Sequence, residues 1–250
     1  MYNFLAERVK NLMYKLLIIE DDQIMGEMLA MYLTEEGYSV KIADHGQKGL
    51  ELAKSFSPDV FLVDMILPDM NGTRLCSELR SFSFAPILIV SMKTDVSDRV
   101  EALQAGADDY ICKPFSLREI SAKIGAMIRR THQYQQPTSI ENTEQTDTTI
   151  PCSENTFLID LERRAIYVNQ FHVETTFSEF EIMRLFITNE GKVFSREELL
   201  YELRGFDSFV TDRAIDVHIA NLRKKIEDNP KEPKYIRTVW GVGYKFISGN

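Results

Sequence analysis

Five short apolar runs alternate with amphipathic stretches in the first half of this 250-residue chain, and this alternation constrains the fold most. The runs, rich in Val, Ile and Leu, are predicted strands over 15–19, 39–43, 60–64, 87–91 and 110–112. Between them, the apolar spacing predicts helices over 23–36, 46–55, 72–80, 95–105 and 116–130. Strands that are apolar on both faces are typical of a parallel sheet covered by helices on both sides. The sequence therefore predicts an α/β fold with a five-stranded, doubly wound parallel sheet.

Polar residues stand where these strands end. Glu20 and Asp21 follow the first strand, Asp64 ends the third, Ser91 ends the fourth and Lys113 follows the fifth. In open parallel sheets the functional site lies at the carboxyl ends of the strands, so these side chains are expected to converge. Taken alone, Asp64 has a second interpretation, as a strand cap that accepts backbone hydrogen bonds in the turn after it.

The chemistry of this set indicates phosphoryl transfer. Clustered carboxylates raise one another's pKa unless a cation offsets their charge. Oxygen ligands suit Mg²⁺, which often bridges protein carboxylates and a phosphate. A hydroxyl group from Ser91 and a positive charge from Lys113 would hold phosphoryl oxygens. Together, these residue types describe a site at which a carboxylate becomes an acyl phosphate.

Composition narrows the class of protein. No run approaches the roughly 20 apolar residues of a membrane span. The net charge of −9 argues against indiscriminate nucleic-acid binding, but residues 213–245 hold eight basic and four acidic side chains. The three cysteines lie far apart without the paired spacing of a zinc site, which favours a reducing cytoplasm: Cys76, Cys112 and Cys152.

The composition changes in the second half. Residues 131–153 are rich in Gln, Thr, Ser and Asn and are predicted to be a flexible linker. Residues 154–250 contain a short strand series, three helices and a hairpin in TVWGVGYKF. Two of the helices open on capping boxes, Thr176 with Glu179 and Ser195 with Glu198.

The third of these helices, from about residue 211 to residue 227, has two different faces. Its core stripe is Ile215, Ile219, Leu222 and Ile226. The other side carries Arg213, Val217, His218, Asn221, Arg223 and Lys224. Such a face fits a DNA major groove, where Asn pairs with adenine, Val contacts a thymine methyl group and cations meet phosphates. By itself, the pattern is better explained by a surface helix with solvated charges.

Four motifs in the first half resemble the receiver domain of two-component response regulators: IIEDD, LVDMILPDMNG, ILIVS and GADDYICKPF. They span almost all of residues 14–130. The resemblance implies that Asp64 accepts a phosphoryl group from a sensor histidine kinase. It also implies a Mg²⁺ ion bound by Asp21, Asp64 and the backbone carbonyl group of Ile66, with Glu20 acting through water.

The same resemblance implies a switch. Ser91 is the expected switch hydroxyl, Tyr110 the switch aromatic and Lys113 the phosphoryl contact, and the Lys113–Pro114 bond is expected to be cis. Family members usually have a small residue after the switch hydroxyl, whereas this chain has Met92. One hypothesis is that Met92 hinders water and prolongs the phosphorylated state. The alternative is that Met92 points into solvent.

The second half resembles the winged-helix effector domain of the OmpR/PhoB family, over about 154–248, in SREELLYELRGF, DRAIDVHIANLRKKIED and YIRTVWGVGYKF. The resemblance implies binding to promoter DNA, with Trp240 and Tyr244 of the wing among the contacts. Many members have an arginine that enters the minor groove where this chain has Trp240. Trp240 is therefore expected on the sugar–phosphate backbone or against its own domain. The loop 205–210 corresponds to a frequent RNA-polymerase contact.

Charge pairs between two receivers are a further feature of this family. The matching pairs here are Arg99 with Glu119, Asp109 with Lys123 and Asp108 with Arg130. Exposed ion pairs contribute little stability, so the expected value of these pairs is to set the register of a homodimer formed on phosphorylation.

The whole chain is thus expected to be a cytoplasmic transcription factor controlled by phosphorylation, with no membrane segment and no dedicated enzyme activity. Two alternatives stay open. One is a phosphohydrolase, which usually needs a second acid where Ile66 stands, and the other is a regulator that acts without phosphoryl control. Residues 1–12 form either a short amphipathic helix or a non-essential extension.

Overall fold

The computed structural model describes residues 13–132, 149–151, 157–161, 163–204 and 213–248. The chain divides into two compact units, residues 1–128 and 129–250. The expectations for residues 1–12, for most of the linker and for the loop 205–210 lie outside the described residues. Across the described ranges, every helix is too short or too polar to cross a bilayer.

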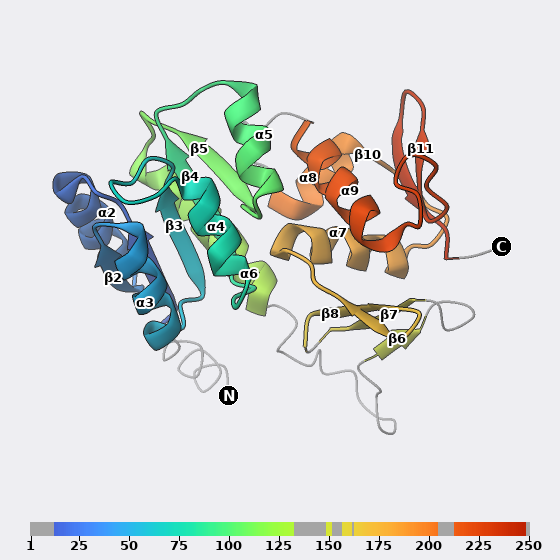
Figure 1. Ribbon diagram of the computed structural model, residues 1–250, viewed down its shortest axis with the longest axis horizontal. Coiled ribbons are helices and arrows are strands. Elements are labelled where there is room, and N and C mark those ends of the chain that lie inside the picture. The colour runs from blue at the N-terminus through green and yellow to red at the C-terminus, as the bar shows by residue number, and fades with distance from the viewer. Residues whose placement is uncertain (1–12, 133–148, 152–156, 162, 205–212, 249–250) are drawn as a thin grey trace, which may run out of the picture. The chain divides into compact units, whose positions relative to one another are not determined.

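The first unit contains a five-stranded parallel sheet in the order β2-β1-β3-β4-β5 (Figure 1). Its strands are β1 (Lys15–Ile19), β2 (Ser39–Ala43), β3 (Val60–Asp64), β4 (Ile87–Ser91) and β5 (Asp109–Cys112). The register aligns Ile19 with Val63, and Asp64 with Val90. The carboxyl ends of β1, β3 and β4 therefore lie side by side at one edge, and the predicted sheet is confirmed.

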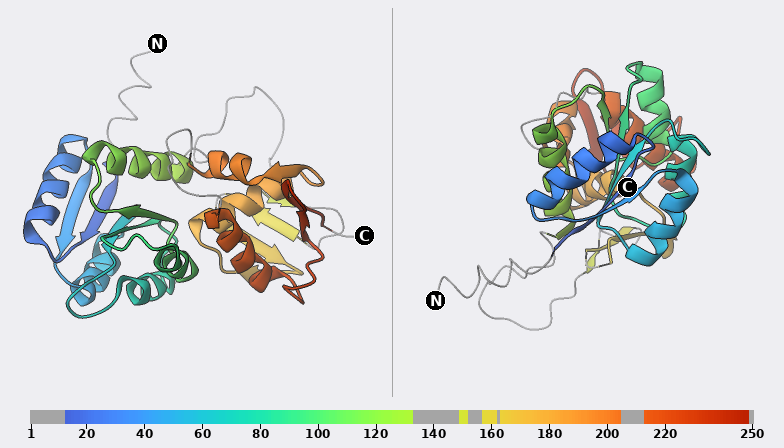
Figure 2. Two further views of the ribbon diagram at one scale, coloured as in Figure 1. Left: turned by 90° about the horizontal axis from the view of Figure 1, so that it is seen from above. Right: turned by 90° about the vertical axis from the view of Figure 1, so that its left-hand side faces the viewer.

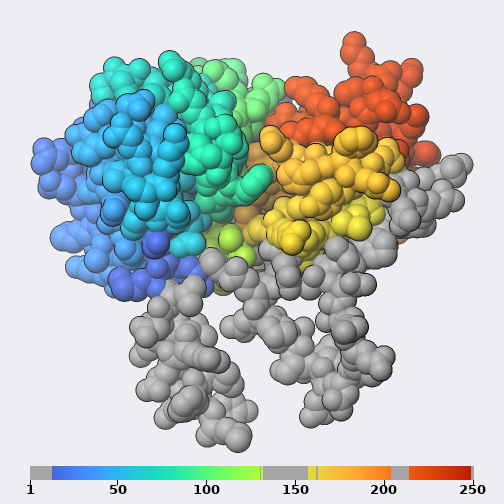
Figure 3. Space-filling model, turned by 60° about the horizontal axis from the view of Figure 1, so that its bottom comes forward, coloured from blue at the N-terminus to red at the C-terminus, as the bar shows by residue number. Residues whose placement is uncertain are grey.

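Helices cover both faces of this sheet (Figures 1 and 2). One face carries α2 (Gln23–Glu35) and α6 (Leu117–His132), and the other carries α3 (Gly46–Phe56), α4 (Gly72–Arg80) and α5 (Val96–Gln104). Figure 3 shows α3 and α4 side by side. Leu16 and Ile18 of β1 face α2 and α6, whereas Leu17 and Ile19 face the other three helices. Because successive residues enter two cores, the strand is apolar throughout.

The turn after β3 depends on a close backbone approach. Asn71 caps α4 by accepting a hydrogen bond from the Thr73 N–H at 3.2 Å, and the Gly72 N–H donates to the Met65 carbonyl at 2.8 Å. A Cβ atom at Gly72 would lie 2.6 Å from the carbonyl oxygen of Asp64. A side chain there would displace the segment that carries Asp64, so the Asn-Gly pair helps to position this carboxylate.

The described residues of the second unit form two small antiparallel sheets and three helices. The first sheet comprises β6 (Thr149–Pro151), β7 (Phe157–Asp160), β8 (Ala165–Val168) and β9 (Phe171–Val173). The helices are α7 (Phe177–Thr188), α8 (Arg196–Arg204) and α9 (Arg213–Ile226). The second sheet, in the order β10-β12-β11, comprises β10 (Val193–Ser195), β11 (Ile236–Val239) and β12 (Gly243–Phe246). This arrangement is the expected winged helix-turn-helix.

The predicted linker is too long at both ends. Thr149–Pro151 is a strand, with Ile150 opposite Ile159 of β7, and α6 continues to His132. The composition of 131–153 as a whole is polar and did not indicate the strand Thr149–Pro151. A strand of three residues at the edge of a sheet has little effect on the average composition.

One core joins the two sheets of the second unit. Phe157 of β7 packs edge-on against Phe246 of β12, with ring centroids 5.0 Å apart.

Both predicted capping boxes are confirmed. The N–H groups of Thr176 and Ser195 donate to Glu179 at 2.8 Å and to Glu198 at 2.7 Å, and each hydroxyl accepts in return.

Candidate functional site

Three carboxylates meet at the carboxyl edge of the parallel sheet. Glu20 and Asp21 follow β1, Asp64 ends β3, and oxygens from all three lie within 4.8 Å of one another. Glu20 and Asp64 are buried, whereas Asp21 is exposed. The pairing of β1 with β3 brings these acids together, so the predicted convergence of the strand ends is found.

The Lys113 ammonium group lies between two of these acids. It donates to both carboxylate oxygens of Glu20, at 2.9 and 3.0 Å, and to Asp64. Burial lowers the pKa of Lys113, but its bonds to Asp64 and Glu20 more than compensate, so the pKa lies above its usual value. The lysine is therefore charged at neutral pH. The Lys113–Pro114 bond is cis, as expected.

One lysine does not neutralise this cluster. Burial raises the pKa of Glu20 to about 7, with a further contribution from the charge of Asp64, although the bond from Lys113 opposes the shift. Three acids thus share one cation, and a second cation would relieve their repulsion. A set of oxygen ligands with this charge fits Mg²⁺.

Ser91 and Ile66 lie near Asp64, one on the neighbouring strand and one in the turn after β3. Ser91 ends the strand next to β3 and is buried, and its Oγ accepts a hydrogen bond from the Lys93 N–H at 3.1 Å. The Ile66 N–H donates to Asp64 Oδ1 at 2.8 Å. The phosphoryl contact of Ser91 and the metal contact of the Ile66 carbonyl stay predictions.

Tyr110 is connected to Ser91 through Lys93. Tyr110 is buried, which raises its pKa, and its hydroxyl group donates to the Lys93 carbonyl at 2.9 Å. Because the Lys93 N–H donates to Ser91, the backbone of Lys93 links the two expected switch residues. Lys93 was not among the residues identified from sequence, and its only signal is its place two residues after Ser91. Met92, between them, is 68% exposed.

Asp108 has a partner that the sequence did not reveal. It is buried, pairs with Arg80 and accepts a hydrogen bond from the Ile87 N–H at 2.9 Å. The expected pairing of Asp108 with Arg130 of a second subunit stays a prediction. The side chain of Arg130 lies outside the described ones.

The other expected dimer residues lie on or beside β5. Lys123 of α6 pairs with Asp109 at 2.8 Å within the chain. Arg99 of α5 lies over the Tyr110 ring, 5.7 Å from its centroid, and both Arg99 and Glu119 are partly exposed. Their pairing between subunits stays a prediction.

Helix α9 packs by the predicted stripe, Ile215, Ile219, Leu222 and Ile226. Its other side differs from the expectation. Val217, His218 and Asn221 are buried as well, whereas Lys224 is exposed. The spacing of residues along a helix identifies its apolar stripe, but it does not show which other parts of the protein cover the remaining faces of the helix. The side chain of Arg213 lies outside the described ones.

Arg223 bonds within the domain. Its guanidinium group donates to the Ile236 carbonyl at 2.8 and 3.1 Å and to Thr238 Oγ1 at 2.8 Å, and it lies over the Tyr244 ring. Arg223 therefore ties α9 to β11, whereas the sequence pattern assigned it to a phosphate.

The two expected contacts of the wing, Tyr244 and Trp240, differ in their exposure on the β11–β12 hairpin. Tyr244 is buried, and its hydroxyl group donates to Asp216 at 2.6 Å and accepts from Arg196 at 3.1 Å. Burial and the bond to Asp216 raise the pKa of Tyr244 to about 12. Trp240, in contrast, is 91% exposed, so it does not pack against its own domain.

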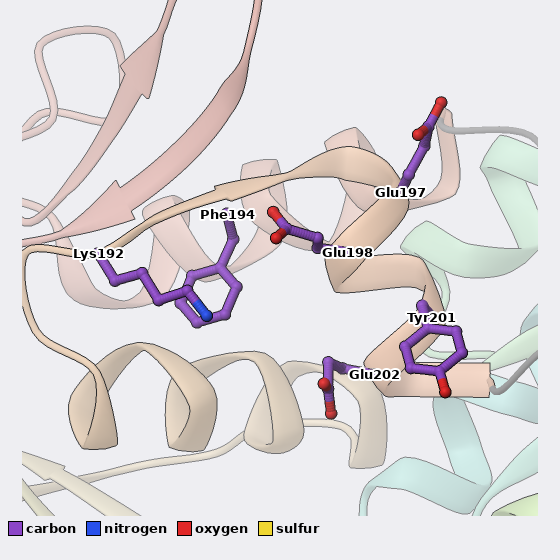
Figure 4. A pocket seen from close by; sticks show the side chains of 6 residues that line it. All are labelled: Lys192, Phe194, Glu197, Glu198, Tyr201 and Glu202. Atoms are coloured by element: carbon purple, nitrogen blue, oxygen red, sulfur yellow. The ribbon is translucent and has the colours of Figure 1, made fainter.

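Helix α8 carries an acidic groove on its exposed side (Figure 4). The groove has a volume of about 260 Å³ and is lined by Lys192, Phe194, Glu197, Glu198, Tyr201 and Glu202. Hydrogen bonds from the backbone and side chain of Ser195 hold the pKa of Glu198 below its usual value. The groove is therefore negatively charged, and α8 directly precedes the loop 205–210.

A parallel sheet with an acidic site at its edge, followed by a winged helix, defines a two-domain response regulator. The chain matches the family models described as "Response regulator receiver domain" over residues 16–125 and "Transcriptional regulatory protein, C terminal" over residues 170–246. It is 38% identical over 232 residues to the transcriptional regulatory protein BaeR of Escherichia coli O6:H1, covering 93% of this chain and 92% of BaeR. The chain belongs to this family of transcriptional response regulators.

Two further similarities extend over both units. The uncharacterized transcriptional regulatory protein YcbL of Bacillus subtilis is 35% identical over 229 residues, covering 92% of this chain and 98% of YcbL. The solved structure of a RitR mutant has a TM-score of 0.75 at 26% identity, covering 94% of this chain and 100% of that one. Each of these similarities therefore covers both domains.

Proposed function

We propose that a sensor histidine kinase phosphorylates Asp64 and that this step controls binding to promoter DNA in the cytoplasm. A carboxylate oxygen of Asp64 attacks phosphorus, the bond from phosphorus to the kinase histidine nitrogen breaks, and an acyl phosphate forms. The observation that carries this proposal is the charged Lys113, which contacts Asp64 and can hold phosphoryl oxygens there.

The acid cluster would hold Mg²⁺ through Asp21, Asp64 and the Ile66 carbonyl group, with Glu20 acting through water. When bound, the ion offsets the negative charge of the carboxylates and of the phosphoryl group. The raised pKa of Glu20 supports this assignment, because burial and the charge of Asp64 disfavour its ionised form and a bound cation would favour it.

We infer that the signal leaves the site through Lys93. The Ser91 hydroxyl group accepts a hydrogen bond from the Lys93 N–H. If this hydroxyl group turns toward a phosphoryl oxygen, that hydrogen bond breaks. Movement of this backbone shifts the carbonyl group that holds the Tyr110 hydroxyl. Tyr110 would then reorient and alter the surface formed by α5, β5 and α6, which favours a receiver homodimer.

The output would be cooperative binding to DNA. A receiver dimer tethers two winged helices, so the second domain binds its tandem half-site at a raised effective concentration. The acidic groove on α8, together with the loop 205–210 that follows it, would face a basic surface of RNA polymerase.

The test replaces Asp64 with Asn and measures phosphoryl transfer, dimerisation and promoter binding together. All three should be lost in Asp64→Asn. The matched control is Asp95→Asn, because Asp95 stands at the start of α5 and its side chain makes no capping hydrogen bond. Equal promoter binding by Asp64→Asn and phosphorylated wild type would favour a regulator that acts without phosphoryl control.

A further inference from the structure

The turn after β3 is bonded to the start of α3. Asp69 of this turn is exposed, and its carboxylate accepts hydrogen bonds from the N–H groups of Gly46 and Gln47, both at 2.8 Å. These are the first two residues of α3, which follows β2. Because the strand order is β2-β1-β3, the two bonds connect the segments that follow the two neighbours of β1.

Asp69 supplies a cap that α3 lacks. His45 stands at the N-cap position of this helix, but its side chain makes no capping hydrogen bond. The first N–H groups of a helix have no partner within the helix, and a carboxylate beside them also meets the positive end of the helix dipole. The bonds from Gln47 and Gly46 hold the pKa of Asp69 below its usual value, so this carboxylate is ionised at neutral pH.

Met70, the next residue, packs directly on the same end of α3. A Cβ atom at Gly46 would lie 2.6 Å from both Cγ and Sδ of Met70, so a glycine leaves the room that this side chain needs. Three residues further along, a Cβ atom at Gly49 would lie 2.6 Å from Cδ1 of Ile19, the last residue of β1. Helix α3 therefore packs on the strand that leads into Glu20, and the turn after β3 contacts α3 at two successive residues.

The same turn carries the backbone of Ile66. Met65 and Leu67 are buried, whereas the side chain of Ile66 is 58% exposed. The core thus holds the residues on either side of Ile66, while Ile66 itself has little to pack against. The position of its carbonyl group relative to the acids that follow β1 depends on how the turn is fixed across β1. The bonds of Asp69 to α3 fix it there.

We propose that Asp69 is a positioning residue of the Mg²⁺ site, because it holds the turn that carries the Ile66 carbonyl group against α3. This inference rests on the proposed Mg²⁺ site and adds a residue that does not touch the ion. Groups that orient metal ligands without touching the metal typically contribute about 10–100-fold in affinity. Loss of the two bonds leaves every ligand present but less well placed, so the site should bind the ion more weakly.

Calorimetric titration of the full chain with Mg²⁺ tests this role. Asp69→Ala should raise the Kd of Mg²⁺ by about tenfold. Asp69→Asn removes the same charge but keeps one acceptor oxygen, so its Kd should lie between those of wild type and Asp69→Ala. The matched control is Asp59→Ala, because the Asp59 carboxylate accepts a hydrogen bond from the Lys15 N–H, at 2.8 Å, at the opposite edge of the same sheet. Asp59→Ala should leave the Kd unchanged.

A small phosphoryl donor separates positioning from general damage to the fold. With acetyl phosphate, a carboxylate oxygen of Asp64 attacks phosphorus, the bond from phosphorus to the acetate oxygen breaks and acetate leaves. Asp69→Ala should react more slowly than wild type at low Mg²⁺ and equally fast at saturating Mg²⁺, because the groups around Asp64 are unchanged. A rate that stays low at saturating Mg²⁺ would show damage beyond the metal site and overturn the proposal.

The titrations also distinguish this inference from the proposal on which it rests. If wild type and Asp69→Ala bound Mg²⁺ equally, Asp69 would not position the site, and the Mg²⁺ site would stand. If Asp69→Asn bound as weakly as Asp69→Ala, the charge of Asp69 would act rather than its bonds, which also overturns the inference. If the wild-type chain bound no Mg²⁺, or Asp21→Asn bound it as tightly as wild type, the proposed metal site itself would be wrong.

Discussion

The two functional regions of this chain are built in different ways. At the receiver edge, the residues expected to act also hold one another, since Lys113 bonds both Glu20 and Asp64. On the winged helix, the expected residues are divided. Arg223 bonds inside the domain, whereas Lys224 faces solvent. The register of a sheet determines which side chains meet at its strand ends. The residues that a helix offers to a partner depend instead on which of its side chains already bond within the domain.

Removing Lys113 should have the largest effect, because it leaves two buried carboxylates without their cation. Lys113→Ala should lower the free energy of unfolding by about 2–3 kcal/mol at pH 8 in the absence of Mg²⁺. The pKa of Glu20 is raised from 4.5 to about 7 on folding, so ionised Glu20 costs stability. This cost is absent below pH 4.5 and grows as the pH rises through 7. The loss in Lys113→Ala should therefore be smaller at pH 6, as measured by urea denaturation.

The control for this loss is Lys48→Ala, which breaks an exposed pair with Asp44 at 3.2 Å. No measurable change in stability is expected, because water screens the exposed pair. If the two variants lost equal stability, the receiver site would not be held together by Lys113.

The neighbours Arg223 and Lys224 sharpen the comparison from the other side, because each substitution to Ala removes one positive charge. Arg223→Ala should lower the stability of the second unit by about 1–2 kcal/mol, since it removes bonds to the Ile236 carbonyl. Lys224→Ala should leave stability unchanged and reduce the salt slope of DNA binding by about 1. Circular dichroism and binding titrations measure the two effects. If Arg223→Ala instead left stability unchanged and reduced the salt slope, Arg223 would contact a phosphate, as the sequence suggested.

Much of the receiver could be predicted from sequence, for a physical reason. Apolar periodicity locates the strands, and a parallel sheet brings their carboxyl ends to one edge, so Asp64 and Lys113 had to meet. The partner of Asp108 could not be predicted in this way. Arg80 lies 28 residues away, and only the packing of α4 against the sheet brings it to Asp108.

The second unit shows the same limit. The core stripe of α9 was predictable because it follows the helical period. The burial of Val217 was not, since it depends on what covers the helix rather than on the helix itself. The sequence left two positions open for Trp240, on the sugar–phosphate backbone or against its own domain. A hairpin pattern does not indicate how far its tip projects.

Mg²⁺ should stabilise the receiver by a smaller amount than Lys113. At ten times its Kd, a ligand that binds only the folded state adds about 1.4 kcal/mol, seen as a higher Tm. Because Glu20 takes up a proton near pH 7, the increase should be smaller at pH 6 than at pH 8. Asp21→Asn should reduce the increase and Asp95→Asn should not. An equal rise of Tm in wild type and Asp21→Asn would place the ion elsewhere.

The smallest effect is expected at Met92. Its side chain is 68% exposed, so it covers little of the neighbouring site in this conformation. Met92→Ala should therefore shorten the lifetime of phosphorylated Asp64 by no more than about twofold, a barrier change of less than 0.5 kcal/mol. The decay of radiolabelled phosphoryl groups measures this lifetime, with Met31→Ala on the exposed side of α2 as the control. A tenfold shorter lifetime in Met92→Ala alone would show that Met92 moves over the acyl phosphate and shields it from water. The receiver site would then depend on a surface side chain, as the winged helix does.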